Sequence, residues 1–285
     1  MGLLIRLGVG VVASGLVGLA AYCRRSLSKS GVVGAMLVGT AIFGFGGWVW
    51  GLLLITFFVL SSLLSRYQQA AKRGLAEKSA KGHQRDLGQA LANGGAGALI
   101  ALASLFYPAP VMLAAFVGAM AAVNADTWAT ELGLLSRRPP RLVTTWEVVE
   151  PGTSGGVSAV GTLASLAGAL TIGVATIGLL MIDGLLGGSV NDLVGVRGVP
   201  GGVLLIPSAV LGGVVGSLFD SLLGATVQAI YYSPTRQQKT EKKTDSDGTP
   251  NVHLRGWRWL GNDCVNFVSS VVGALAGALV WGVVR

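Results

Sequence analysis

Residues 109–135 read APVMLAAFVGAMAAVNADTWATELGLL, a long apolar run whose last third carries amide and acidic side chains. A helix needs about 20 predominantly apolar residues to cross a bilayer, and this run exceeds that length. Seven further runs of the same kind cover most of the chain, at 2–22, 31–46, 48–65, 88–106, 155–181, 202–230 and 261–284. The sequence therefore predicts an all-α, polytopic transmembrane helical bundle of about eight spans, with residues 1–285 forming a single integral membrane domain.

The composition supports the same class of protein. Hydrophobic residues make up 52% of the 285 residues and charged residues only 12%, against about 25% charged residues in an ordinary soluble domain. The chain also holds 44 glycines. Glycine weakens helices in water, whereas in lipid small residues allow helices to approach closely. The composition excludes an ordinary soluble domain.

The lysines and arginines predict an orientation in the membrane. Loops 23–30, 66–87, 136–154 and 231–260 alternate along the chain and together hold 18 of the 21 basic residues. Because basic residues concentrate in cytoplasmic loops, we predict that these loops are cytoplasmic and that both termini lie on the non-cytoplasmic side. Within the last loop, residues 233–251 are polar and flanked by prolines, which is typical of a mobile segment. The lipid bilayer explains the net charge of +8, so we predict no nucleic-acid partner.

Four of the predicted spans carry polar side chains within apolar sequence. They occur at 89–93 in the fourth span, 124–131 in the fifth, 217–228 in the seventh and 262–266 in the eighth. The fourth and eighth spans start at the cytoplasmic face and the fifth and seventh end there, so all four groups fall in the same third of the membrane. Ionisable residues inside a membrane are costly, and this convergence predicts a functional site near the cytoplasmic face.

Helical spacing predicts which of these side chains face one another. Ser217 and Asp220 share a stripe of the seventh span. In the fifth span Asn124 and Glu131 share a stripe, whereas Asp126 points well away from it on an ideal helix. A local unwinding near Asp126 would reconcile the two. Interhelical hydrogen bonds, worth about 0.6 kcal/mol on average, are an alternative explanation for the amide and hydroxyl stripes.

A short glycine- and serine-rich segment, GTSGGVS at 152–158, leads into the sixth span. Glycines allow backbone N–H groups to approach an anion, hydroxyls add donors, and a following helix N-terminus favours negative charge. The segment lacks the lysine and the spacing of a P-loop. Beside carboxylates and basic loops, it predicts a phosphate-binding site.

Carboxylates beside a phosphate site indicate a divalent metal, because Mg²⁺ commonly binds one or two carboxylates together with substrate phosphates. We predict Asp126, Asp220 and Asp263 as the Mg²⁺ ligands. Lys81 and Arg85, in the second basic loop, are placed to reach a triphosphate at the cytosolic face.

Five ordered motifs resemble the transmembrane protein 19-like family of integral membrane proteins: QALANGG (89–95), NADTWATELG (124–133), GTSGGVS (152–158), GSLFDSLLGATVQ (216–228) and NDCVNF (262–267). The resemblance covers nearly the whole chain. That family includes the plant phytyl-phosphate kinase of tocopherol synthesis. It is also distantly similar to membrane phytol and dolichol kinases and to cytidylyltransferases that use CTP.

The resemblance implies a membrane isoprenoid-phosphate kinase. Such an enzyme transfers a phosphoryl group from a nucleoside triphosphate, with CTP the expected donor, to a prenyl monophosphate such as phytyl or geranylgeranyl phosphate. By carry-over onto the matching positions, Asp126, Asp220 and Asp263 would hold Mg²⁺. The predicted catalytic residues are Asp126, Asp220, Asp263, Glu131, Lys81 and Arg85, and the predicted substrate- and phosphate-binding residues are Thr153, Ser154, Gly155, Gly156, Asn124, Asn93, Gln89, Asn262, Asn266 and Ser217.

Two other functions use similar residues. A CTP-dependent cytidylyltransferase making a CDP-lipid needs the same metal and nucleotide but attacks the α-phosphate. A cation-coupled transporter also places acids in the membrane, but it predicts sites near the midplane between inverted repeats. The acids here are predicted on the cytoplasmic side, so transport ranks third. An oligomer is compatible with all three functions.

Overall fold

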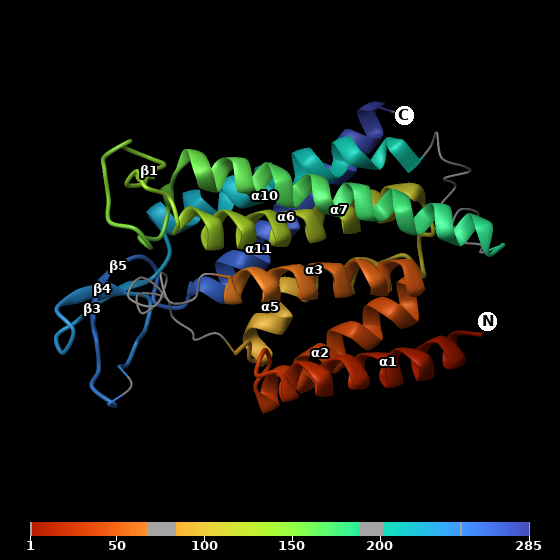
Figure 1. The fold of residues 1–285 in the computed structure, drawn as a ribbon, viewed down its shortest axis with the longest axis horizontal. Helices are drawn as coiled ribbons and strands as arrows, with labels where there is room; N and C mark the ends of the chain where they lie inside the picture. Colours follow the sequence, from red (N-terminus) through yellow and green to blue (C-terminus); the bar gives the residue numbers. More distant parts are fainter. Residues whose placement is uncertain (1, 68–83, 188–201, 246, 285) are drawn as a thin grey trace.

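The computed structural model describes residues 2–67, 84–187, 202–245 and 247–284, which form a bundle of long helices with two small sheets at one end (Figure 1). In chain order the helices are α1 (Leu3–Cys23), α2 (Lys29–Ala41) continued by the π-helix η1 (Ile42–Gly46), α3 (Trp48–Arg66), α5 (Leu87–Ala103), α6 (Pro110–Gly133), α7 (Ala159–Leu185), α10 (Leu205–Thr226) and α11 (Asn262–Val284).

Each predicted span corresponds to one of these helices, so the predicted helical membrane bundle is confirmed. In the described residues, seven helices are long and apolar enough to cross a membrane, and α5 is an apolar helix just below that length. The predicted ends are least accurate for α7, which starts at Ala159 rather than at residue 155. The cause is local: Ser158 adopts an extended backbone and its hydroxyl accepts the Gly161 N–H, which begins the helix there.

Both chain ends lie at the end of the bundle opposite the sheets (Figure 1). The described parts of the four basic loops lie at the sheet end. For example, the Arg66 guanidinium donates to Ser26 between the first two loops, and Arg85 exchanges backbone bonds with Ser26 and Ser28. The described parts of all the loops predicted to be cytoplasmic therefore share one end of the bundle.

The segments that connect α6 to α7 and α10 to α11 contain short strands. Strands β1 (Arg141–Leu142) and β2 (Gly156–Val157) pair antiparallel. Strands β3 (Ile230–Ser233), β4 (Gln238–Thr240) and β5 (Val252–Arg255) form an antiparallel sheet in the order β4-β3-β5.

Part of the segment 233–251, which is predicted to be mobile, forms a strand and local hydrogen bonds, and its mobility stays a prediction. A β-prone run, Ile230 to Tyr232, pairs on both sides. The intervening polar residues bond to one another: the Ser233 hydroxyl donates to Asp245, and the Asn251 amide donates to the Lys242 carbonyl. Arg255 then anchors the sheet by donating to the last carbonyls of α10. These polar residues satisfy local hydrogen bonds, which composition alone does not reveal.

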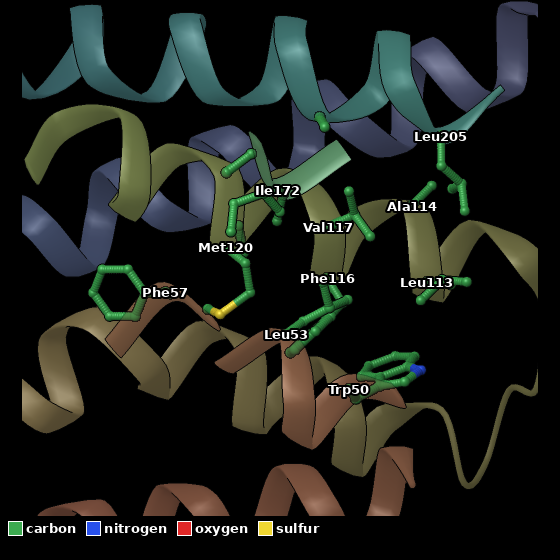
Figure 2. Packing of buried hydrophobic residues seen from close by; sticks show 14 of the residues in the cluster. Trp50, Leu53, Phe57, Leu113, Ala114, Phe116, Val117, Met120, Ile172 and Leu205 are labelled. Atoms are coloured by element: carbon green, nitrogen blue, oxygen red, sulfur yellow. The ribbon is translucent and has the colours of Figure 1, made fainter. Parts of the chain in front are cut away.

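Helix α6 lies at the centre of the bundle and packs on α3, α5, α7, α10 and α11. Figure 2 shows its residues Leu113, Phe116 and Met120 among apolar side chains of the neighbouring helices. Phe116 stacks on Trp50 of α3 with ring centroids 4.4 Å apart. Asp126 and Glu131 follow this buried stretch on the same helix.

Three glycines bring α6, α10 and α11 into backbone contact. A Cβ added at Gly118 would lie 2.4 Å from the Gly273 carbonyl oxygen, and one at Gly212 would lie 2.8 Å from the Gly118 Cα. Asp126 and Asp220 each follow their glycine by eight residues, which is about 12 Å along a helix. The glycine crossing therefore sets both carboxylates at the same depth.

Candidate functional site

A cavity of about 590 Å³ opens at the sheet end of the bundle. Its walls come from α5, α6, α10, α11, the first turns of α7 and the two extramembrane segments. Of the residues proposed from the sequence, the structure brings thirteen together around it: Arg85, Gln89, Asn93, Asp126, Glu131, Thr153, Ser154, Gly155, Gly156, Ser217, Asp220, Asn262 and Asn266. All four polar groups of the predicted spans thus contribute to one space.

Asp126 reaches the cavity from a regular helix. Helix α6 runs without a break from Pro110 to Gly133, and the cavity is lined by Asp126, Thr130 and Glu131 from one of its faces. No local unwinding is present near Asp126. Asn124, on the same stripe as Glu131 but two turns further into the bundle, is fully buried, and its amide donates to the Gly168 carbonyl at 2.8 Å. Asn124 therefore belongs to the packing of α6 on α7.

Two carboxylates form the acidic side of the cavity. Asp126 and Asp220 are close enough to repel each other, and Glu241 adds a third negative charge to the same field. The Oδ2 atom of Asp220 is buried and has no hydrogen-bond partner among the described residues. Like charges held together around an unpartnered oxygen favour a cation at this position.

Asp263 lies apart from this pair. It follows Asn262 on α11, and Asn262 and Asn266, one helical turn apart, line the cavity where Asp263 does not. Within the described ranges, no three His, Cys, Asp or Glu side chains are grouped closely enough to hold a metal ion by themselves. The donor set nevertheless fits Mg²⁺, because this ion is commonly held by one or two carboxylates with waters and substrate phosphates.

The loop at 152–158 wraps the end of α10. Gly152 and Gly155 have positive φ angles of 80° and 83°, which glycine adopts without strain. A Cβ at Gly155 would meet the backbone of Ala225 at 2.5 Å. The loop is therefore pressed against α10, and it lines the cavity where α7 begins.

Several donors of this loop are already engaged. The Thr153 hydroxyl donates to the Glu150 carbonyl at 2.7 Å, and the Gly156 N–H donates to the Thr153 carbonyl. The Ser154 hydroxyl donates to Glu241 at 2.7 Å. The hydroxyls of Thr153 and Ser154 are thus both engaged, and an anion here would have to replace Glu241 as the acceptor of Ser154 or bind at the N-terminus of α7.

Glu241 is an acidic cavity residue that the sequence analysis did not propose. It follows β4 and accepts hydrogen bonds from Ser154 and from the Gln228 side chain, the latter at 2.8 Å. Its neighbour Lys242 also lines the cavity. Both residues lie in the segment predicted as a polar loop, and only pairing of β4 with β3 directs them to the site.

The side of the cavity opposite the loop is cationic. Arg85 lies just before α5, and Gln89 and Asn93 follow it at four-residue intervals in the first turns of the helix, where Asp86 and Gln89 form a capping box. Burial lowers the pKa of Arg85 to about 10, and the negative charge of Glu131 opposes this shift, so the guanidinium stays protonated at neutral pH. Glu131 accepts the Ser65 hydroxyl at 2.6 Å. Lys81 lies outside the described residues.

Comparison with known proteins places these features in a family. The family described as "Integral membrane protein DUF92" matches residues 12–274. Protein PGR of Arabidopsis thaliana is 34% identical over 278 residues, which cover 93% of this chain and 92% of that protein. Uncharacterized membrane protein MJ0933 of Methanocaldococcus jannaschii is 31% identical, covering 98% of this chain and 95% of the relative. Protein VTE6, chloroplastic, of Arabidopsis thaliana is 25% identical, covering 89% of this chain and 65% of the relative. No solved structure matches this chain.

Proposed function

This chain belongs to the integral membrane protein DUF92 family, and from this premise we propose that it is a membrane prenyl-phosphate kinase. The reaction transfers the terminal phosphoryl group of a nucleoside triphosphate, with CTP the expected donor, to a prenyl monophosphate and gives the diphosphate. The family match and the plant relatives confirm the motif resemblance described above. That resemblance, to a family containing the phytyl-phosphate kinase, supplies the reaction class.

One observation carries the proposal. A single cavity in a lipid-embedded bundle presents two carboxylates, one with an unpartnered oxygen, together with a buried guanidinium and a glycine- and serine-rich loop at a helix N-terminus. Transfer between two phosphate groups needs this combination, because negative charge on both reactants must be neutralised while their oxygens are aligned.

The chemistry assigns simple roles to the residues. The attacking oxygen belongs to a phosphate that is already ionised, so no strong general base is required. Asp126 and Asp220 would hold Mg²⁺, which supplies charge neutralisation on the transferring phosphates when bound. Arg85 neutralises a phosphate group on the α5 side of the cavity, while Ser154 and the N-terminus of α7 position a phosphate group on the other side. Rate enhancement then comes from positioning and charge neutralisation.

We place the cavity at the cytoplasmic face. The four loops whose described parts lie at the cavity end hold most of the lysines and arginines of the sequence, and basic loops are typically cytoplasmic. A soluble nucleotide would enter from that side, while the lipid substrate arrives within the bilayer. A reporter fused at residue 86 that scored as external would contradict this orientation.

The test is a substrate panel on purified protein in mixed micelles, with several prenyl monophosphates against CTP, ATP, GTP and UTP in the presence of Mg²⁺. We expect a prenyl diphosphate and a nucleoside diphosphate, and at least a hundredfold slower turnover in Asp220→Asn. Asp183→Asn is the matched control. Asp183 is also a buried helix acid, but its Oδ1 accepts the Trp48 indole N–H at 2.9 Å, and it does not line the cavity. Release of pyrophosphate with a CDP-lipid would replace the kinase by a cytidylyltransferase, and unchanged turnover in Asp220→Asn would refute the site.

A further inference from the structure

A second, apolar cavity of about 90 Å³ lies between α1, α2, α3 and α5. We call it the apolar chamber. Almost all the side chains that line it are aliphatic or aromatic, and its four polar ones are Ser14, Arg85, Gln89 and Asn93. Ser14 is already bonded, since its hydroxyl donates to the Gly10 carbonyl and pairs with Thr40. The other polar side chains that line the chamber, Arg85, Gln89 and Asn93, all lie at its α5 end.

The apolar chamber and the large polar cavity share a wall. Arg85, Gln89 and Asn93 line both spaces. The Arg85 guanidinium lies 5.4 and 5.6 Å from the ring centroids of Phe57 and Phe58, so aromatic faces contact the cation from the chamber side. Its Nη1 atom is buried and has no hydrogen-bond partner among the described residues. A buried, unpartnered donor on a cation favours an anionic acceptor at this junction.

These observations define one ligand chemistry, an anion joined directly to an apolar chain. Resting on the proposed function, we propose that the apolar chamber binds the isoprene unit next to the phosphate of the prenyl monophosphate, while Arg85, Gln89 and Asn93 hold that phosphate. The prenyl monophosphate thus binds at the α5 side of the large polar cavity. The nucleotide binds at the other side, which is formed by Ser154 and α7. Figure 1 shows α5 well separated across the bundle from the segment around β1, which connects α6 to α7 and contains Ser154.

The volume sets how much of the chain is enclosed. An apolar cavity of about 150 Å³ binds a six-carbon ring, so by the same ratio about 90 Å³ holds roughly three to four carbons, the greater part of one branched isoprene unit. Longer chains extend from the chamber into the hydrocarbon of the bilayer. Specificity then depends on the unit next to the phosphate and little on chain length. Phytyl and geranylgeranyl chains share that unit and differ only in the saturation of later ones, so both bind alike.

The experiment introduces a phenylalanine into the apolar chamber and, as a control, the same residue outside it on the same helices. Ala35 of α2 and Ala13 of α1 line the chamber from different helices and are half-buried, so Ala35→Phe and Ala13→Phe insert a ring there. The matched controls are Val33→Phe and Val12→Phe, which place the same ring at exposed positions on the same two helices. Each CH₂ that loses its burial weakens binding about fourfold. We expect KM for prenyl monophosphates to rise about tenfold or more in the chamber variants, and KM for the nucleotide to change less than twofold.

A binding readout separates this proposal from the kinase activity. The probe is a farnesyl monophosphate analogue carrying a diazirine in the unit next to the phosphate, crosslinked to purified protein and mapped by peptide mass. We expect labelling in α1, α2 or α3, reduced in Ala35→Phe and unchanged in Val33→Phe, with farnesyl, geranylgeranyl and phytyl monophosphates competing within about threefold of one another.

The two ideas can fail independently. Labelling of the chamber without formation of any prenyl diphosphate would leave the lipid site standing and overturn the kinase reaction. Normal diphosphate formation with unchanged KM in both chamber variants, or with labelling confined to other helices, would overturn the chamber. Thermal melting of each variant in detergent identifies misfolding, and a chamber variant that melts as the wild type yet keeps its KM counts against the proposal.

Discussion

The glycine crossing gives the sharpest prediction, Gly118→Ala. The added Cβ would lie 2.4 Å from the Gly273 carbonyl oxygen, whereas ordinary contact begins near 3.4 Å, so α6 and α11 must separate by about 1 Å. The clash is with backbone, which no rotamer change relieves. Overpacking of this kind costs about 1–3 kcal/mol, partly offset by the higher helix propensity of alanine, about 1 kcal/mol.

The functional effect of Gly118→Ala should exceed its effect on stability. Asp126 lies on the same helix eight residues beyond the crossing, so a shift of α6 carries its carboxylate away from Asp220. A misplacement of about 1 Å costs about a hundredfold in rate. We expect a melting temperature a few degrees lower in detergent, measured by tryptophan fluorescence, and prenyl-diphosphate formation reduced by about two orders of magnitude.

The matched control is Gly178→Ala in α7, where an added Cβ has nothing within 4 Å. This variant should melt at or slightly above the wild-type temperature and keep full activity. The reasoning is refuted if Gly118→Ala matches the wild type in both assays, or if Gly178→Ala is impaired to the same extent.

Three further outcomes are expected. Glu241→Gln should raise the Mg²⁺ concentration for half-maximal rate about tenfold, because one negative charge near the cation is lost, and Glu147→Gln, on the exposed β1 loop, should leave the Mg²⁺ titration unchanged. Arg255→Ala should destabilise the protein by about 1–2 kcal/mol, because its bonds to the last carbonyls of α10 are lost, whereas exposed Arg258→Ala should melt as the wild type. The Ser233 hydroxyl holds the pKa of Asp245 below its usual range. The stability that the ionised Asp245 contributes is therefore present above about pH 4 and is lost as the pH falls through the lowered pKa of the folded state. Hydrogen exchange in β3 should show that loss, and Asp245→Asn should abolish its pH dependence.

The membrane part of the fold was predictable because lipid imposes a simple rule on sequence. Runs of about 20 apolar residues predicted each described helix of the bundle. The basic residues in alternate loops predicted which connecting segments lie together at one end. Helix ends depended on local bonds instead, as the Ser158 cap at α7 shows. The sheet of β3, β4 and β5 was missed because its strands are very short and mostly polar, so its stability rests on side-chain bonds such as the one from Ser233 to Asp245.

The site was partly predictable for a related reason. Asp126 and Asp220 stood out because acids within apolar helices are rare, and both line the cavity. Phase arguments were weaker, since they set Asp126 apart from the stripe of Asn124 and Glu131, whereas Asp126 and Glu131 line the cavity and Asn124 does not. Asp263 was chosen for its charge, although its neighbour Asn262 faces the cavity. Glu241 carried no signal, because an acid among lysines in a polar segment is ordinary until the chain folds over the cavity.

The bond from Ser154 to Glu241 has a thermodynamic consequence. A serine hydroxyl carries one proton, so Ser154 donates either to Glu241 or to a phosphate oxygen, and the two acceptors compete. A ligand that accepts the hydrogen bond of Ser154 leaves the Glu241 carboxylate with one hydrogen bond fewer, while the bond from Gln228 remains. Linkage requires the converse to hold by the same factor: whatever draws Glu241 away from Ser154, a cation included, strengthens anion binding at that hydroxyl. A metal ion at Glu241 and a phosphate at Ser154 would then bind with positive cooperativity, because both favour the state in which the Ser154 hydroxyl no longer donates to Glu241.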